Sequence, residues 1–135
     1  FRFDAVMYRT LPEGMKEEEV EELDLSNMSL SILNLARFSA LQVLRVNGNV
    51  VTDADLVESG ITACTSLEFL DMSNNKVEKM DRLATLLDTM PGLKTVMVVG
   101  NPCFDTNSFT NRVNLLSRLA DIKGALTEFN LTVLN

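Results

Sequence analysis

The sequence predicts an α/β solenoid in which a parallel sheet forms the concave face and helices lie on the convex side. Three observations predict it: one residue pattern recurs along the chain, each copy contains a short apolar/polar alternation, and segments between copies have helical spacing. The pattern is apolar-x-x-apolar-x-apolar-x-x-Asn-x-apolar. Its copies begin at Val20, Leu41, Leu67 and Leu93, with a truncated copy at Leu126, and so start 21, 26, 26 and 33 residues apart.

Repeats of about 20–29 residues with this core are the sequence mark of a leucine-rich repeat, so we expect a right-handed leucine-rich repeat solenoid. Each unit can bury its apolar side only against its neighbours, which forces the units to stack. We expect a single domain over residues 1–135: residues 1–19 form an N-terminal cap or extension, residues 20–103 form four repeats, and residues 104–135 form a C-terminal cap.

The strands are expected in the alternating core of each copy. Residues 44–46, 70–72 and 96–98 each place one other residue between two apolar ones. Alternation with a period of two is typical of a strand that buries one face. The residues between the inward-pointing ones should therefore face the concave surface.

The segment before the fourth copy predicts a helix. Its apolar residues recur at helical spacing, at Leu83, Leu86, Leu87 and Met90. Asp81 is expected to begin this helix, and Pro91 and Gly92 are expected to end it.

A shorter helix is predicted before the third copy. Leu56, Val57 and Ile61 are its expected apolar residues. Asp53 is expected to be its N-cap and Gly60 to break it.

The asparagine slot of the pattern predicts a structural role. It holds Asn49, Asn75 and Asn101, whereas the first copy has Met28 at this position. A side-chain amide can donate and accept hydrogen bonds at once. We therefore interpret these asparagines as a stacked ladder that satisfies loop backbone groups, rather than as binding residues.

Negative charge is concentrated near the start of the chain. The net charge is −7, and seven acidic residues lie between Glu13 and Asp24 against one base, Lys16. Two interpretations stay open: a solvated capping face, or a docking site for a basic partner segment. The residues of the docking hypothesis are Glu18, Glu19, Glu21, Glu22 and Asp24.

The composition argues against an enzyme. The chain has no histidine, the commonest general base and metal ligand, and no glycine-rich phosphate loop or paired-cysteine metal motif. We predict no catalytic residue, metal site or cofactor. Cys64 and Cys103 are interpreted as small core residues. Because the sequence has no cysteine-rich caps, no signal peptide and no long apolar run, we expect an intracellular protein, in the cytoplasm, cytoskeleton or nucleus, that does not enter the membrane.

Binding is expected on the concave face of the sheet. The predicted partner-binding residues are Val43, Arg45, Phe69, Asp71, Met97 and Val99. Four of them, Val43, Phe69, Met97 and Val99, would form an apolar patch, and such patches on a protein surface tend to be interaction sites. The alternatives are that a terminal helix or a second copy covers this patch, or that the register differs by one residue.

Several motifs resemble a known group. Residues 70–77 (LDMSNNKV) and 98–102 (VVGNP) resemble the last repeats and carboxy-terminal cap of short intracellular eukaryotic leucine-rich repeat proteins. This group includes the regulatory subunit of protein phosphatase 1, outer-arm dynein light chain 1, the spliceosomal A-prime protein and the leucine-rich domain of mRNA export factors.

The resemblance implies a non-enzymatic module that binds another protein, with a cytoskeletal or ciliary adaptor first among its roles. A ribonucleoprotein, splicing or mRNA-export adaptor and a phosphatase-type regulatory scaffold are the alternatives. Direct nucleic-acid binding is disfavoured by the acidic first segment, because it depends on Lys and Arg side chains that neutralise phosphates. The sequence predicts no oligomeric state.

Overall fold

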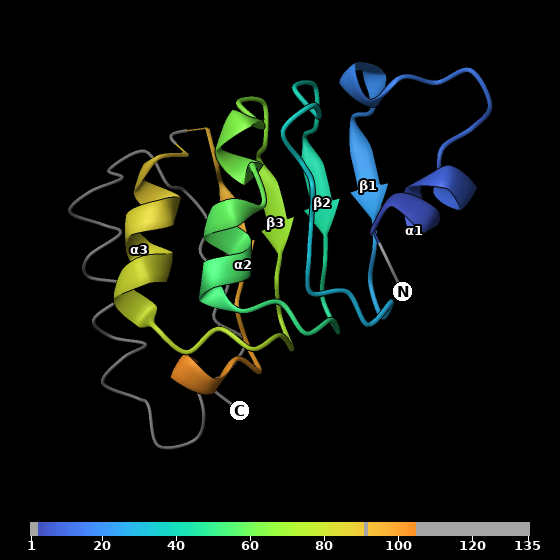
Figure 1. The fold of residues 1–135 in the computed structure, drawn as a ribbon. Coiled ribbons are helices and arrows are strands. Elements are labelled where there is room, and N and C mark those ends of the chain that lie inside the picture. Colours follow the sequence, from blue (N-terminus) through green and yellow to red (C-terminus); the bar gives the residue numbers. More distant parts are fainter. Residues whose placement is uncertain (1–2, 91, 105–135) are drawn as a thin grey trace.

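Four parallel strands form a single sheet in the order β1-β2-β3-β4 (Figure 1). They are β1 (Glu22–Asp24), β2 (Val43–Arg45), β3 (Phe69–Asp71) and β4 (Thr95–Met97). The computed structural model describes residues 3–90 and 92–104, so the predictions for Pro91, for the truncated copy at Leu126 and for nearly all of the C-terminal cap lie outside the described residues. The sheet confirms the predicted α/β solenoid.

Helices lie mainly on one side of this sheet. Helix α2 (Asp53–Glu58) and helix α3 (Met80–Asp88) contact each other and cover the convex side (Figure 1). The opposite side of the sheet is called the concave face. Helix α1 (Phe3–Thr10) lies beside β1, and three short 3-10 helices complete the described part: η1 (Glu17–Glu19), η2 (Ile61–Ala63) and η3 (Pro102–Phe104). The connection from β1 to β2 contains no helix.

The core lies between the strands and the returning segments. The central residue of each strand points into it, and Leu44, Leu70 and Val96 have no exposed surface. Phe38, in the connection after β1, is also fully buried and packs edge-on against Phe3 of α1, with ring centroids 6.5 Å apart. Helix α1 therefore extends the core beyond the first repeat.

Both helix starts predicted from the sequence were wrong by one or two residues. Helix α2 is capped by Thr52, whose hydroxyl accepts from the Asp55 N–H while the Asp55 carboxylate accepts from the Thr52 N–H. This reciprocal capping box satisfies two backbone donors, which frees Asp53 for a buried contact described below. Helix α3 follows Lys79, and Asp81 lies inside its first turn. A carboxylate there still stabilises the helix through its dipole.

Val57 lies in α2 as expected, but its exposure differs from that of the other two apolar residues predicted for the short helix. Its side chain is 52% exposed, whereas Leu56 and Ile61 are buried as expected. Helix α2 has six residues, so it provides less than two turns and only one narrow inward face. The break at Gly60 is present, with a φ of 79° just after the helix. The stripe of α3 is buried as predicted.

The three slot asparagines link consecutive repeats through the backbone. The Asn75 side-chain nitrogen donates to the Val46 and Met72 carbonyls at 3.0 and 3.1 Å, and its oxygen accepts from the Val51 N–H at 3.1 Å. Asn49 and Asn101 make the corresponding bonds one repeat before and one repeat after. Each asparagine therefore bonds carbonyls of its own repeat and of the preceding repeat.

The residue before each slot has a left-handed backbone. Asn27, Gly48, Asn74 and Gly100 occupy this position in successive repeats, with φ values of 57°, 70°, 55° and 78°. Glycine and asparagine are the residues that tolerate this conformation best. A Cβ on Gly48 would collide with the Asn27 side chain, and one on Gly100 with that of Asn74. The alternation of asparagine and glycine therefore lets the turns stack closely.

Candidate functional site on the concave face

Three rows of side chains cross the concave face. Strand pairing places Glu22, Val43, Phe69 and Thr95 in one row and Asp24, Arg45, Asp71 and Met97 in the next. These are the alignments expected from the repeat pattern, so the register does not differ by one residue. The third row follows the strand ends and contains Ser26, Asn47, Ser73 and Val99.

The apolar residues of these rows are partly exposed. Val43, Phe69, Met97 and Val99 are all half-buried, and Val99 packs against the core. Phe69 lies directly beside Val43 on the neighbouring strand, whereas Met97 is paired with Asp71 in the next row. The patch is therefore centred on β2 and β3 and is interrupted by polar groups toward β4.

Arg45 covers the ring of Phe69. The guanidinium carbon lies 4.6 Å from the ring centroid, within the range of a cation–π contact. The sequence placed both residues on this face but did not predict that they stack. Arg45 and Phe69 are diagonal neighbours on two adjacent strands. The distance between them depends on the register of the sheet.

Two serine-bound carboxylates flank Arg45 in the sheet. Asp24 and Asp71 are its neighbours on either side, and each accepts hydrogen bonds from the N–H and the hydroxyl of the serine two residues later. The hydroxyl and N–H of Ser26 hold the pKa of Asp24 below its ordinary value, with a further contribution from Arg45. Asp71 is only 7% exposed, so it presents a fixed acceptor rather than a projecting charge.

The residues of the acidic hypothesis gather at the first edge of the sheet. Glu21, Glu22 and Asp24 lie just before or within β1, and Glu18 and Glu19 belong to η1. All five side chains are exposed. The structure brings them together at one end of the repeat stack, where Glu22 and Asp24 pair with Val43 and Arg45 of the concave face.

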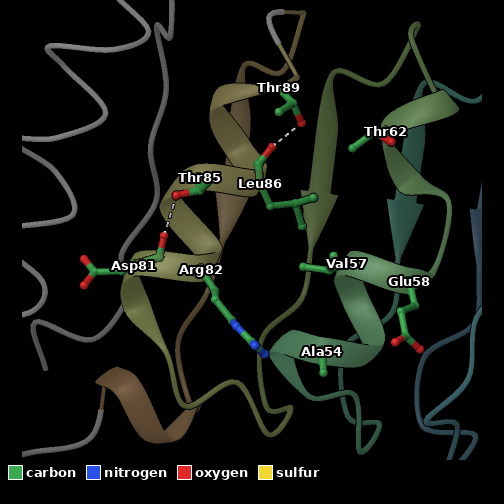
Figure 2. A pocket seen from close by; sticks show the side chains of 9 residues that line it. All are labelled: Ala54, Val57, Glu58, Thr62, Asp81, Arg82, Thr85, Leu86 and Thr89. Carbon is green, nitrogen blue, oxygen red and sulfur yellow. Dashed lines mark hydrogen bonds between the residues drawn. The ribbon is translucent and has the colours of Figure 1, made fainter.

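A separate groove of about 680 Å³ lies between α2 and α3 on the convex side (Figure 2). The exposed Val57 lines it, and no binding role was predicted for this residue from the sequence. The hydroxyls of Thr85 and Thr89 donate to carbonyls of their own helix at 2.9 and 2.6 Å. The groove therefore offers apolar surface with few uncommitted polar groups.

Arg82, at the wall of this groove, forms an ion pair with Asp53 at 3.1 Å. Burial disfavours the charged form of Asp53, but hydrogen bonds from the Glu78 N–H and from Arg82 outweigh it and lower its pKa. The pair joins the start of α2 to α3, which is a structural role.

Both cysteines of the chain lie within the described residues. Burial raises the pKa of the Cys64 thiol to about 11, which keeps it protonated and unreactive at neutral pH. Cys64 and Cys103 are both buried, as expected. Within residues 3–90 and 92–104, no three His, Cys, Asp or Glu side chains are grouped to hold a metal ion. In the same ranges no helix has the length and apolarity to cross a membrane.

Comparison with solved structures gives the same architecture. A leucine-rich repeat protein of Leptospira interrogans, LIC12759, superimposes with a TM-score of 0.55 at 17% sequence identity. The fold is that of a leucine-rich repeat solenoid. The match covers 84% of this chain and 26% of the Leptospira chain, so this sequence spans about a quarter of its neighbour's length. No family model matches the sequence, and no curated protein matches it.

The comparison supports the fold alone. Stacked repeats of this fold create an extended concave surface. At this level of identity the neighbour supports no assignment to the short-repeat class and no statement about origin or partner.

Proposed function

We propose that this chain is a protein-interaction module that binds a partner protein through the concave face. The observation that carries the proposal is the half-exposed Phe69, flanked by Val43 and stacked under Arg45. Aromatic residues, methionine and arginine are enriched at the centres of protein interfaces, while most other contacts contribute little energy. The partner-binding set is Val43, Arg45, Phe69, Asp71, Met97 and Val99.

The chemistry of this face defines what the partner should offer. Phe69 and Val43 favour an apolar side chain, and the exposed guanidinium of Arg45 favours a carboxylate or carbonyl acceptor. Asp71 is already held by Ser73, so its position is fixed before binding. A preorganised group loses little entropy when the complex forms.

The charges of the three rows favour a protein over a nucleic acid. The rows contain one basic side chain, Arg45, and three acidic ones, Glu22, Asp24 and Asp71. Nucleic-acid affinity depends on several Lys and Arg contacts with phosphates. An RNA-related role would therefore pass through a protein that itself binds the RNA.

The resemblance to short intracellular repeat proteins supports a finer proposal. In this finer proposal, residues 1–135 form one domain with a C-terminal cap, and the protein is a cytoskeletal or ciliary adaptor inside the cell. The alternatives are a ribonucleoprotein or mRNA-export adaptor and a phosphatase-type scaffold. Imaging a tagged copy in its native cells separates them: a cytoskeletal or ciliary signal supports the adaptor, and a nuclear signal contradicts it.

The binding proposal itself is tested by the double substitution Phe69→Ala and Met97→Ala. Both side chains are half-buried on the concave face and neither fills the core, so the fold should persist. The matched control is Val57→Ala, which removes an exposed apolar side chain from the convex side. Affinity capture followed by mass spectrometry compares the three chains.

A further inference from the structure

Among the described residues, none pairs with the outer edge of β1, the first edge of the sheet. Strand β1 pairs only with β2 among the described strands. The Glu21 carbonyl accepts a hydrogen bond from the Val43 N–H, and the Leu25 N–H donates one to the Arg45 carbonyl. Because main-chain groups alternate along a strand, those of Glu22 and Asp24 point away from β2. No described residue forms a main-chain hydrogen bond with them on that side.

A groove of about 410 Å³ runs along this edge. The loop that joins α1 to η1 curves out beside β1 (Figure 1). Residues of this loop line the groove. Leu11, Pro12 and Met15 line it from the loop, and Met15 is 41% exposed. The groove is therefore apolar on one side and bounded by unpaired backbone on the other. Its volume is within the range of about 300–1,000 Å³ of small-ligand pockets.

The charge along the groove is negative. Glu19, Glu21, Glu22 and Asp24 line it, and all four are exposed. A second copy of β1 would place these acids against identical acids, which is destabilising. The charge therefore disfavours pairing between two copies of this edge and selects a strand that carries positive charge.

We propose that the free edge of β1 binds an extended segment of a partner protein that carries lysine or arginine at alternate positions. The segment adds a strand to the sheet, with main-chain hydrogen bonds to Glu22 and Asp24. Because strand side chains alternate between faces, its basic residues lie beside the carboxylates of Glu22 and Asp24. The intervening apolar residues enter the groove beside Leu11 and Met15. This edge adjoins the concave face, because Glu22 and Asp24 pair with Val43 and Arg45, but strand addition uses the other side of β1 and does not depend on the proposed function.

The probe is a fluorescent Lys-Val-Lys-Val-Lys peptide added to the full chain. A Glu-Val-Glu-Val-Glu peptide controls for charge, and a basic peptide N-methylated along one edge controls for main-chain pairing. We expect the basic peptide to bind, to weaken as salt is raised, and to bind at least about tenfold more tightly than either control. Hydrogen exchange followed by NMR should show new protection at the amides of Glu22 and Asp24.

Variants of the chain separate edge pairing from simple charge attraction. Glu22→Pro removes the outward N–H and leaves the pairing with β2, since proline is tolerated on an edge strand. Glu22→Gln removes the charge and keeps the N–H. Both substitutions should weaken binding of the basic peptide, and Glu22→Pro should weaken it by about tenfold. The convex-side Glu58→Gln is the matched charge control and should bind as the wild type does, as should Phe69→Ala.

Three results would overturn the proposal: no measurable binding of the basic peptide, equal binding of the N-methylated peptide, or exchange protection elsewhere than β1. Circular dichroism confirms that each variant is folded. If Glu22→Pro does not fold, the N-methylated peptide and the exchange pattern on the wild-type chain still decide. Failure of the concave-face proposal, tested with Phe69, would not change the peptide result. Failure of the peptide to bind would not contradict the concave-face proposal.

Discussion

Asn75 satisfies backbone groups in two neighbouring repeats with one side chain. It is only 3% exposed, and its side-chain oxygen accepts a hydrogen bond from the Val51 N–H. Its nitrogen donates to the carbonyls of Val46, Met72 and Ser73, and each of these keeps another donor, from Asn49, Asn101 and the Gly48 N–H respectively. Removal of the Asn75 side chain therefore leaves mainly one buried group, the Val51 N–H, without its acceptor.

We predict that Asn75→Ala lowers the free energy of unfolding by about 2 kcal/mol or more, because an unpaired buried donor costs about 1–3 kcal/mol and a cavity adds to it. Urea denaturation followed by circular dichroism measures the change. Asn34→Ala, on an exposed side chain, should stay within about 0.5 kcal/mol. Equal effects of the two substitutions would contradict the structural role of the ladder.

Asp53 links pH to stability at the convex side. Its pKa is lowered from 3.8 in the folded chain, so its contribution is complete above the unfolded value and is lost as pH falls through the folded value. We predict that Asp53→Asn destabilises the protein by about 1 kcal/mol at pH 7, a modest figure because Arg82 is exposed to solvent.

The difference between wild type and Asp53→Asn should shrink below about pH 4. Urea titrations at pH 7 and pH 3 measure it, and Asp88→Asn controls for the loss of one exposed carboxylate. A difference that grows as the pH falls would mean that Asp53 is not stabilised in its charged form.

At the scale of the elements, the turn before each slot asparagine is the feature repeated most strictly. We predict that Gly48→Ala costs about 2 kcal/mol or more, since φ is 70° and the new Cβ would meet the Asn27 side chain. Gly14 provides the matched control: its φ is 85°, and a Cβ there would meet no atom within 4 Å.

Gly14→Ala should therefore show the backbone penalty alone, about 1 kcal/mol. Thermal and urea unfolding of both variants give the comparison. If the two substitutions cost the same, the close stacking of successive turns contributes nothing to stability.

The strands were predictable and the helix boundaries were less so. A period of two leaves one register that buries Leu44, Leu70 and Val96, and the structure has it. The start of α2 instead depends on competition between Thr52 and Asp53, both good cap residues. Asp53 forms its ion pair with Arg82 from the next repeat, a contact that local sequence does not encode.

At the scale of the molecule, each repeat contacts the repeats before and after it. The sheet therefore has a concave face and an edge at either end of the stack. Positions on the concave face were predictable because they follow from the period. The Arg45–Phe69 stack and the open edge beside Met15 were not, since both depend on how neighbouring segments lie in space. The predicted apolar patch is consequently smaller and more polar than its sequence suggests.

The central claim is that the concave face binds a partner protein. Its most direct test is the amount of each captured protein recovered by the Phe69→Ala and Met97→Ala double variant, relative to wild type and to Val57→Ala. Removing the anchor of an interface typically costs 2 kcal/mol or more, so we predict a loss of at least about tenfold with the control unchanged. Equal recovery by all three chains, each folded by circular dichroism, would contradict the claim.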